Sequence, residues 1–178
     1  FLILLGSQSP FAGKGVVKKL LQWTNQQEEK ANLNINSVVK ACFNMSKSKT
    51  GALIIITTDS ELKYHASTGV EIDSKLSSIF LESIFFKNSP LHDGGVIIHN
   101  NRIKAAKCIL PLSDNPDIPI HFGLRHRAAA GLTENSPAMA IVVSEETGKI
   151  SFIVGTKYKL DLSPEKLKEE IERTIKES

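Results

Sequence analysis

Residues Gly123 to Ala129 contain the run Arg125, His126 and Arg127, three neighbouring side chains that carry or can gain positive charge. Such groups repel one another and are hard to bury unless a polyanion lies against them. Arg offers paired donors to phosphate oxygens, and His adds one more donor. If the run opens a helix, the helix N–H groups and dipole assist the same anion. The run indicates a phosphate site, although by itself it is also typical of a solvated basic helix end.

A second segment, Pro90 to Gly95, places His92 and Asp93 before Gly94 and Gly95, immediately ahead of an apolar run. The two glycines let the backbone come close to a ligand and leave the carboxylate accessible. A carboxylate can hold a divalent cation and help to deprotonate a hydroxyl group. The histidine can serve as a metal ligand or as a donor. The alternative is an ordinary β-turn, in which Asp-Gly is common.

A third segment, Ser144 to Gly148, follows an apolar run and contains Glu145 and Glu146. Functional groups often collect at strand ends in α/β sheets. Adjacent side chains of a strand point to opposite faces, so at most one of the two carboxylates need face a site. A charged hairpin turn is the alternative interpretation.

The composition indicates one domain that could position these segments. The chain has 178 residues, of which 41% are hydrophobic and 23% charged, so it can bury a core without disulfides or a structural metal. Its two cysteines, Cys42 and Cys108, lie among apolar residues and are expected to be reduced, buried thiols. The net charge of +3 is too small and too scattered to favour duplex nucleic acid as a partner.

Hydrophobic periodicity and turn residues predict a mixed sheet covered by helices. Apolar residues at helical spacing predict helices from Ile35 to Phe43 and from Ile72 to Ile84, and Ser163-Pro164 opens a last helix with Leu167, Ile171 and Ile175 inward. The other expected elements are a short basic helix (14–23), a turn at Asp59 and Ser60, strands (52–57, 140–143, 150–154), a short strand (62–66), a hairpin (96–99 and 102–109) and a helix (122–133).

Taken together and in order, four segments resemble the diadenylate cyclase family, whose Asp-Gly-Ala and Arg-His-Arg motifs are specific as a pair. They are Pro90 to Gly95, Leu110 to Ser113, Gly123 to Ala129 and Ser144 to Gly148, and the likeness runs from about Ile35 to Val154. The resemblance implies an α/β fold with a twisted mixed β-sheet flanked by helices on both faces. It also implies a nucleotidyltransferase that condenses two ATP molecules into cyclic di-AMP and two pyrophosphates across a face-to-face homodimer.

The resemblance also implies roles for individual residues. It implies a catalytic role for Asp93, beside the attacking 3′-hydroxyl, and for Arg125, His126 and Arg127. It implies nucleotide binding by Gly94, Gly95, Leu110, Gly123, Leu124 and Ser144, and binding of Mn²⁺, Mg²⁺ or Co²⁺ by His92, Asp93 and Glu146. Two positions depart from the family pattern: Leu124 replaces the usual Thr, and Gly95 replaces the usual Ala.

The organisation of the chain most resembles the membrane-anchored branch of this family. Residues 1–34 are therefore expected to be a linker with a short helix that follows a membrane segment absent from this sequence, and residues 35–178 to be the catalytic domain. The resemblance places a soluble domain at the cytoplasmic face of the cell membrane, with ATP and a second copy of itself as partners and no nucleic acid. The alternatives are an adenylyltransferase with another acceptor, a non-catalytic ATP sensor and an oligomerisation domain.

Overall fold

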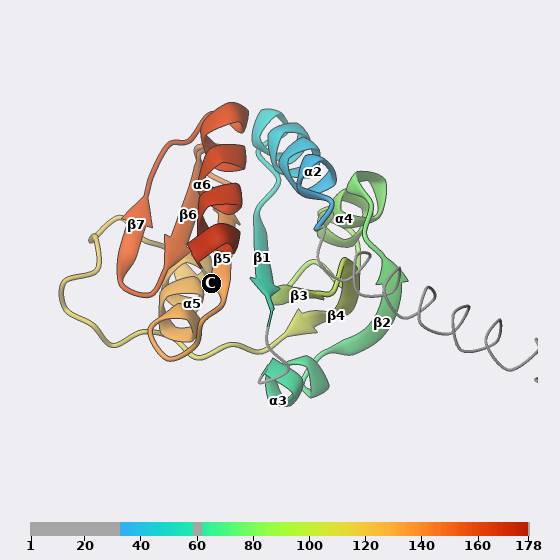
Figure 1. The fold of residues 1–178 in the computed structure, drawn as a ribbon, viewed down its shortest axis with the longest axis horizontal. Helices are drawn as coiled ribbons and strands as arrows, with labels where there is room; N and C mark the ends of the chain where they lie inside the picture. Colours follow the sequence, from blue (N-terminus) through green and yellow to red (C-terminus); the bar gives the residue numbers. More distant parts are fainter. Residues whose placement is uncertain (1–32, 59–61, 178) are drawn as a thin grey trace, which may run out of the picture. The chain divides into compact units, whose positions relative to one another are not determined.

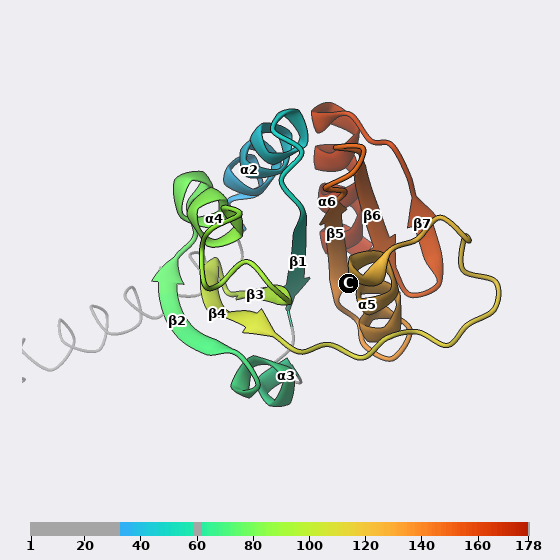
Figure 2. The ribbon, with the colours of Figure 1, turned by 180° about the vertical axis from the view of Figure 1, so that it is seen from behind.

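The computed structural model describes residues 33–58 and 62–177, which form alternating helices and strands (Figures 1 and 2). The helices are α2 (Ile35–Lys47), α3 (Lys63–Ser67), α4 (Ser78–Phe85), α5 (Leu124–Thr133) and α6 (Pro164–Glu177). The strands are β1 (Ala52–Thr57), β2 (Val70–Lys75), β3 (Gly95–His99), β4 (Arg102–Cys108), β5 (Met139–Val143), β6 (Ile150–Val154) and β7 (Lys157–Lys159). The basic helix predicted for 14–23 and the turn predicted at Asp59 and Ser60 lie outside the described residues.

The strands form one seven-stranded sheet in the order β2-β4-β3-β1-β5-β6-β7. Strands β1 and β3 run parallel, and every other neighbouring pair is antiparallel. This is the mixed sheet that the sequence predicts. The hairpin β3–β4 is also confirmed, and its turn residues Asn100 and Asn101 both have positive φ angles, which Asn tolerates better than most residues.

Strand β1 lies at the centre of the sheet and is buried along its whole length. Side chains of a strand alternate between the two faces. Accordingly Ala52, Ile54 and Ile56 belong to one hydrophobic cluster, whereas Leu53 and Ile55 belong to another. The sheet therefore has a core on each face, and each core needs a helical cover.

Helices cover both faces, as predicted. Residues of α2, α4 and α6 complete the first cluster, and residues of α5, together with Leu62, complete the second. Figure 1 shows α2 and α6 side by side on one face of the sheet, and in Figure 2 α5 lies on the other face. In α6, Leu167 and Ile171 are buried and Ile175 packs against the same core, while Ser163 caps the helix by accepting a hydrogen bond from the Lys166 N–H at 3.3 Å.

Two expectations for the elements were wrong, and one strand was not predicted. The segment 62–66 is not a strand, because Leu62 and Ala66 meet the same core four residues apart, which is the spacing of one helical turn. The helix expected from Ile72 begins only at Ser78, where the Ser77 hydroxyl accepts from the Phe80 N–H, and Ile72 belongs to strand β2. No pattern of residues predicted the three-residue edge strand β7.

Both cysteines are free and buried, as expected. Burial raises the pKa of the Cys42 thiol to about 12 and that of Cys108 to about 11. Both thiols are therefore protonated and unreactive near neutral pH.

Candidate functional site

The chemically interesting segments meet at one edge of the sheet because of the strand directions. Parallel strands β1 and β3 begin at the same edge, and their antiparallel neighbours β5 and β4 end there. The pairs Ala52↔Val143 and Gly95↔Cys108 mark this edge. Residues just before β1 and β3 and just after β5 and β4 are thereby brought together, although they are spread over about half of the sequence.

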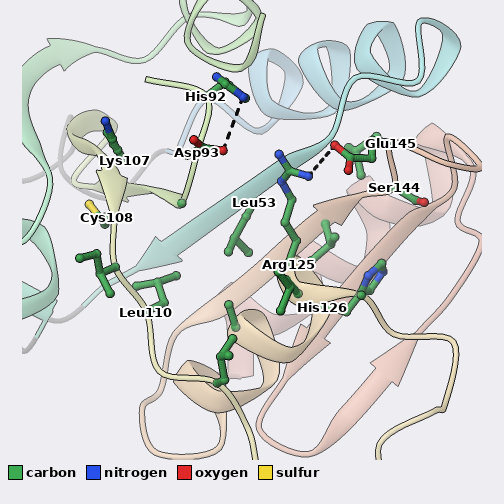
Figure 3. Close-up of a pocket in the computed structure, with 18 of the residues that line it drawn as sticks. Leu53, His92, Asp93, Lys107, Cys108, Leu110, Arg125, His126, Ser144 and Glu145 are labelled. Carbon is green, nitrogen blue, oxygen red and sulfur yellow. Dashed lines mark hydrogen bonds and ion pairs between the residues drawn. The ribbon is translucent and has the colours of Figure 1, made fainter. Parts of the chain in front are cut away.

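A cavity of about 1060 Å³ lies at this edge and continues to the first turn of α5 (Figure 3). Such a volume suits a nucleotide-sized ligand. Most of the residues that the sequence predicts for the site line it. They are His92, Asp93, Gly94, Leu110, Gly123, Leu124, Arg125, His126, Ser144 and Glu146.

Two predicted site residues, Gly95 and Arg127, are not among the residues that line this cavity. Gly95 is buried behind it, where an added Cβ would lie 2.8 Å from the Leu110 Cδ1 atom. Arg127 is half-buried at the end of the first turn of α5, and its carbonyl accepts a hydrogen bond from the Ser113 N–H at 3.0 Å. A helix rotates by about 100° per residue, so the three side chains of the Arg-His-Arg run cannot all point into one cavity.

His92 and Asp93 form a pair at the cavity wall. The Nδ1 atom of His92 lies 2.6 Å from the Ser89 carbonyl oxygen, which can only accept, so Nδ1 carries the proton. In the neutral ring the lone pair is then on Nε2, which lies 3.5 Å from the Asp93 Oδ1 atom. A lone pair and a carboxylate this close repel each other unless a proton or a cation lies between them.

This pair has the chemistry of a metal site completed by a substrate. A metal-binding His commonly donates its other ring N–H to a backbone carbonyl, as His92 does here. Among residues 33–58 and 62–177, no group of three or more His, Cys, Asp and Glu side chains is close enough to hold an ion. Protein sites for Mg²⁺ that rely on substrate phosphates need only one or two carboxylates. His92 and Asp93, with Glu146 in the same cavity, fit a cation that arrives with phosphate groups.

The backbone at the junction of β3 and β4 is shaped around Gly94. Its φ is +76°, and a Cβ here would lie 2.5 Å from the Cys108 carbonyl oxygen. Opposite, the β3–β4 register shifts between Gly95 and Ile97, and Lys107 adopts φ +57°, an unusual angle for a lysine. Bulges next to active sites often redirect a side chain, and Lys107 lines the cavity.

The first turn of α5 forms the opposite wall. Gly123 is the N-cap residue of α5. Because it has no side chain, it cannot accept a hydrogen bond from the first N–H groups of the helix. Arg125 Nη1 donates to Glu145 Oε2 at 2.9 Å, and Figure 3 shows this contact across the cavity from Asp93. The helix N-terminus and a guanidinium thus lie together, which favours an anion here.

His126 is partly buried and packed against its neighbours. Its ring stacks on Phe122 with 4.5 Å between the centroids, and its Nε2 lies 3.1 Å from the Ser151 hydroxyl. Burial, and secondly the nearby His121, lower the pKa of His126 to about 4. The imidazole is therefore neutral near pH 7, and the Arg-His-Arg run carries two positive charges rather than three.

The remaining wall is largely apolar. Leu53, Cys108 and Val142 come from the strands, Leu110 follows β4, and together they suit a flat, uncharged ring. At the cavity mouth, Val70, Ile109, Leu112 and Leu124 are exposed. An anion-binding end and an apolar end in one cavity match the two halves of a nucleotide.

Several cavity residues were missed in the sequence. No sequence pattern indicated Lys107 as a site residue, because a lysine in a strand is ordinarily exposed to solvent. Only one of Glu145 and Glu146 was expected to face the site, because neighbouring side chains of a strand point to opposite faces. Both residues instead lie in a turn after β5, and both line the cavity. Gly51 does not line the cavity and was not predicted as a site residue, although a Cβ there would lie 2.6 Å from the Arg125 Nη1 atom.

Comparison with known proteins gives a consistent result. The family described as "DisA bacterial checkpoint controller nucleotide-binding" (DAC) matches residues 39–158. The cyclic di-AMP synthase CdaA of Bacillus subtilis is 42% identical over 151 residues, covering 85% of this chain and 55% of the relative. The diadenylate cyclase of Mycoplasma genitalium is 34% identical over 156 residues, covering 84% of this chain and 78% of the relative.

Solved structures agree with these relatives. A double mutant of DacA from Staphylococcus aureus superposes with a TM-score of 0.76 at 42% identity, covering 84% of this chain and 97% of the other. A protein described as a hypothetical membrane spanning protein from Bacillus cereus gives a TM-score of 0.69 at 39% identity, covering 72% of this chain and 63% of that one.

The chain spans about half the length of the first curated relatives that it matches. Within the described residues, no helix combines the length and the apolar character needed to cross a bilayer.

Proposed function

The chain belongs to the DAC family of nucleotide-binding domains, and from this premise we propose that it is a diadenylate cyclase. Such an enzyme is a nucleotidyltransferase that converts two ATP molecules into one cyclic di-AMP and two pyrophosphates. The observation that carries this proposal is the shared cavity of Asp93 and Arg125, which come from the Asp-Gly and Arg-His-Arg segments. A carboxylate that can accept a proton thus faces a guanidinium that can hold a phosphate.

The ends of the cavity suit the two ends of ATP. The apolar wall around Leu53 and Leu110 would take the adenine, and Arg125 with the α5 N-terminus would take the triphosphate. The neutral His126 would contribute through hydrogen bonding and packing, since its charge is suppressed by burial. Gly94 and Ser144 also line the cavity, and the Ser144 hydroxyl would donate a further hydrogen bond to a phosphate oxygen.

The chemistry is two balanced substitutions at phosphorus. In each, the 3′-oxygen of one ATP forms a bond to the α-phosphorus of the other. The bond between that phosphorus and the oxygen that bridges the α- and β-phosphates breaks. Asp93 accepts the proton of the 3′-hydroxyl, and pyrophosphate departs with the electron pair. Arg125 stabilises the charge that grows on the departing pyrophosphate.

Residues His92, Asp93 and Glu146 would hold a divalent cation, Mn²⁺, Mg²⁺ or Co²⁺, together with the phosphates. When bound, the cation neutralises phosphate charge and favours ionisation of the attacking hydroxyl. The hydrogen bond from His92 Nδ1 to Ser89 supports this assignment, because it leaves Nε2 as the ligand atom.

One cavity presents one nucleotide, so closing a ring of two nucleotides needs two cavities face to face. A two-fold homodimer supplies this arrangement, because the same surface then serves both partners. The exposed Ile109, Leu112 and Leu124 at the cavity mouth support such a contact. Holding two ATP molecules in line makes each attack effectively intramolecular.

We also propose that residues 35–178 are the catalytic domain and that residues 1–34 link it to a membrane segment outside this sequence. The likeness to the Bacillus cereus protein, which is described as membrane spanning, supports a tether. The domain would then work at the cytoplasmic face of the cell membrane.

The test of the proposed activity is incubation of the 178-residue chain with ATP and Mn²⁺, followed by mass spectrometry of the products. Cyclic di-AMP and pyrophosphate in a 1:2 ratio are expected. Adenylylated protein or small-molecule acceptors without cyclic di-AMP would indicate an adenylyltransferase instead. Bound but unconverted ATP at every protein concentration would indicate a sensor.

A further inference from the structure

Gly51, just before β1, leaves room for the ends of two neighbouring side chains, and its backbone conformation would accept another residue. Its φ lies outside the left-handed region, so a side chain would cause no backbone strain. However, a Cβ here would lie 2.6 Å from the Arg125 Nη1 atom and 2.9 Å from the Glu145 Oε2 atom. The guanidinium therefore lies against bare backbone.

Arg125 is fixed at one end of its guanidinium. Its Nη1 donates to Glu145 at 2.9 Å, and the Arg125 side chain is 22% exposed while that of Glu145 is 60% exposed. Three separate segments thus define the position of one cation: the turn before β1, the first turn of α5 and the turn after β5. Arg side chains have many rotamers, so an unheld guanidinium would spread over several positions.

The held guanidinium still has unused donors. Its Nε atom is buried, and it has no hydrogen-bond partner within the described part of the chain. A buried donor without a partner is unfavourable. The Arg125 side chain also lines the cavity, where its terminal N–H groups can donate to an anion. The Glu145 contact uses Nη1, so it orients the group without occupying all of its N–H bonds.

We propose that Gly51 and Glu145 are positioning residues of the anion site: Gly51 gives the space and Glu145 the contact that hold Arg125 ready for the triphosphate. The inference rests on the proposed function in taking ATP as the anion. Both residues act through Arg125, and neither needs to touch the nucleotide.

Binding of a non-hydrolysable ATP analogue with Mn²⁺, measured by calorimetry on the full chain, tests the proposal. We expect Gly51→Ala and Glu145→Ala each to weaken binding about ten-fold, which is the size of one charge-assisted hydrogen bond. Glu145→Gln keeps an acceptor oxygen and should therefore lose less affinity for the analogue than Glu145→Ala. The control is Glu169→Ala, which removes an equally exposed carboxylate from a surface ion pair on α6 and should bind normally.

The double-mutant cycle gives the decisive comparison. In the Arg125→Ala background, adding Gly51→Ala or Glu145→Ala should change the affinity no further. If Gly51 and Glu145 instead had a purely structural role, their substitution would weaken analogue binding in the Arg125→Ala background as well. Such additive losses of affinity would overturn the proposal. Wild-type affinity of Glu145→Ala would also overturn it.

A second readout does not depend on affinity. The Nε–Hε resonance of Arg125 in a ¹H–¹⁵N spectrum should move in Gly51→Ala and in Glu145→Ala without nucleotide, and unmoved resonances would overturn the proposal. Analogue binding without cyclic di-AMP production would overturn only the proposed activity. Failure of the wild-type chain to bind the analogue would overturn both.

Discussion

The Nδ1 atom of His92 lies 2.6 Å from the carbonyl oxygen of Ser89, so that the other ring nitrogen faces the carboxylate of Asp93. One backbone contact thus fixes the tautomer of His92 and prepares its Nε2 as a ligand. The position of a main-chain carbonyl controls the chemistry of the side chain three residues later.

For this reason we expect His92→Gln to weaken Mn²⁺ binding at least about ten-fold in the presence of the ATP analogue. Calorimetric titration of Mn²⁺ measures this loss. His65→Gln, on α3 and outside the cavity lining, is the matched control and should titrate as wild type. Unchanged Mn²⁺ affinity in His92→Gln would remove His92 from the metal site.

Asp93→Asn should keep nucleotide binding and lose cyclic di-AMP production by at least about 100-fold, because the amide cannot accept the hydroxyl proton. Chromatography of the products measures the rate. Asp114→Asn changes an exposed carboxylate that does not line the cavity and should retain activity. Normal production by Asp93→Asn would contradict its role as the base.

Gly94→Ala should lower the free energy of unfolding by at least about 1–2 kcal/mol, because an L-residue resists a positive φ. The added Cβ would also lie 2.5 Å from the Cys108 carbonyl oxygen, which is backbone and cannot move away easily. Urea unfolding measures the change. Gly123→Ser provides the contrast: the position is open, with φ −77°, and Ser is a good N-cap, so no loss is expected there.

Lys107→Gly should raise the free energy of unfolding by about 0.5–1 kcal/mol, because glycine adopts φ +57° without the penalty that lysine carries. Thermal unfolding measures the gain. Lys104→Gly, in the same strand but without a positive φ, should instead destabilise the protein. A lower melting temperature for Lys107→Gly would show that contacts of this side chain outweigh the backbone strain.

The stability of the domain should depend on pH through His126. Its pKa is lowered to about 4 in the folded state, mainly by burial, against an ordinary value of 6.5. The unfolded chain therefore binds more protons between these values, and the free energy of unfolding rises with pH across that window. The contribution is complete above about pH 6.5 and is lost as pH falls toward 4.

Urea unfolding at pH 4.5, 5.5 and 7 checks this slope, with His126→Gln as the comparison. The variant should show a shallower rise between pH 4.5 and 7 than the wild type. Equal slopes in the two proteins would contradict burial of a neutral imidazole.

Local sequence was sufficient for elements whose signals are short-range. The β1 run, the Asn100-Asn101 turn and the Ser163-Pro164 helix start each depend on a few neighbouring residues, and all three were predicted correctly. The secondary structure predicted for Leu62 to Ile84 was partly wrong, because the apolar residues of this segment fit both helix spacing and strand spacing. Only packing against the two cores decides between those patterns there.

The sequence by itself determined which residue types this protein can bring to phosphate chemistry, because Asp93, Arg125 and Glu146 each lie in a distinctive local motif. Only the tertiary structure decided which of them share a cavity. Parallel β1 and β3 begin where antiparallel β5 and β4 end, and this pairing unites Gly51, Asp93 and Glu145 at one edge of the sheet. Strand direction and partner choice depend on long-range burial, and Arg127 is not among the residues that line the cavity to which Arg125 belongs.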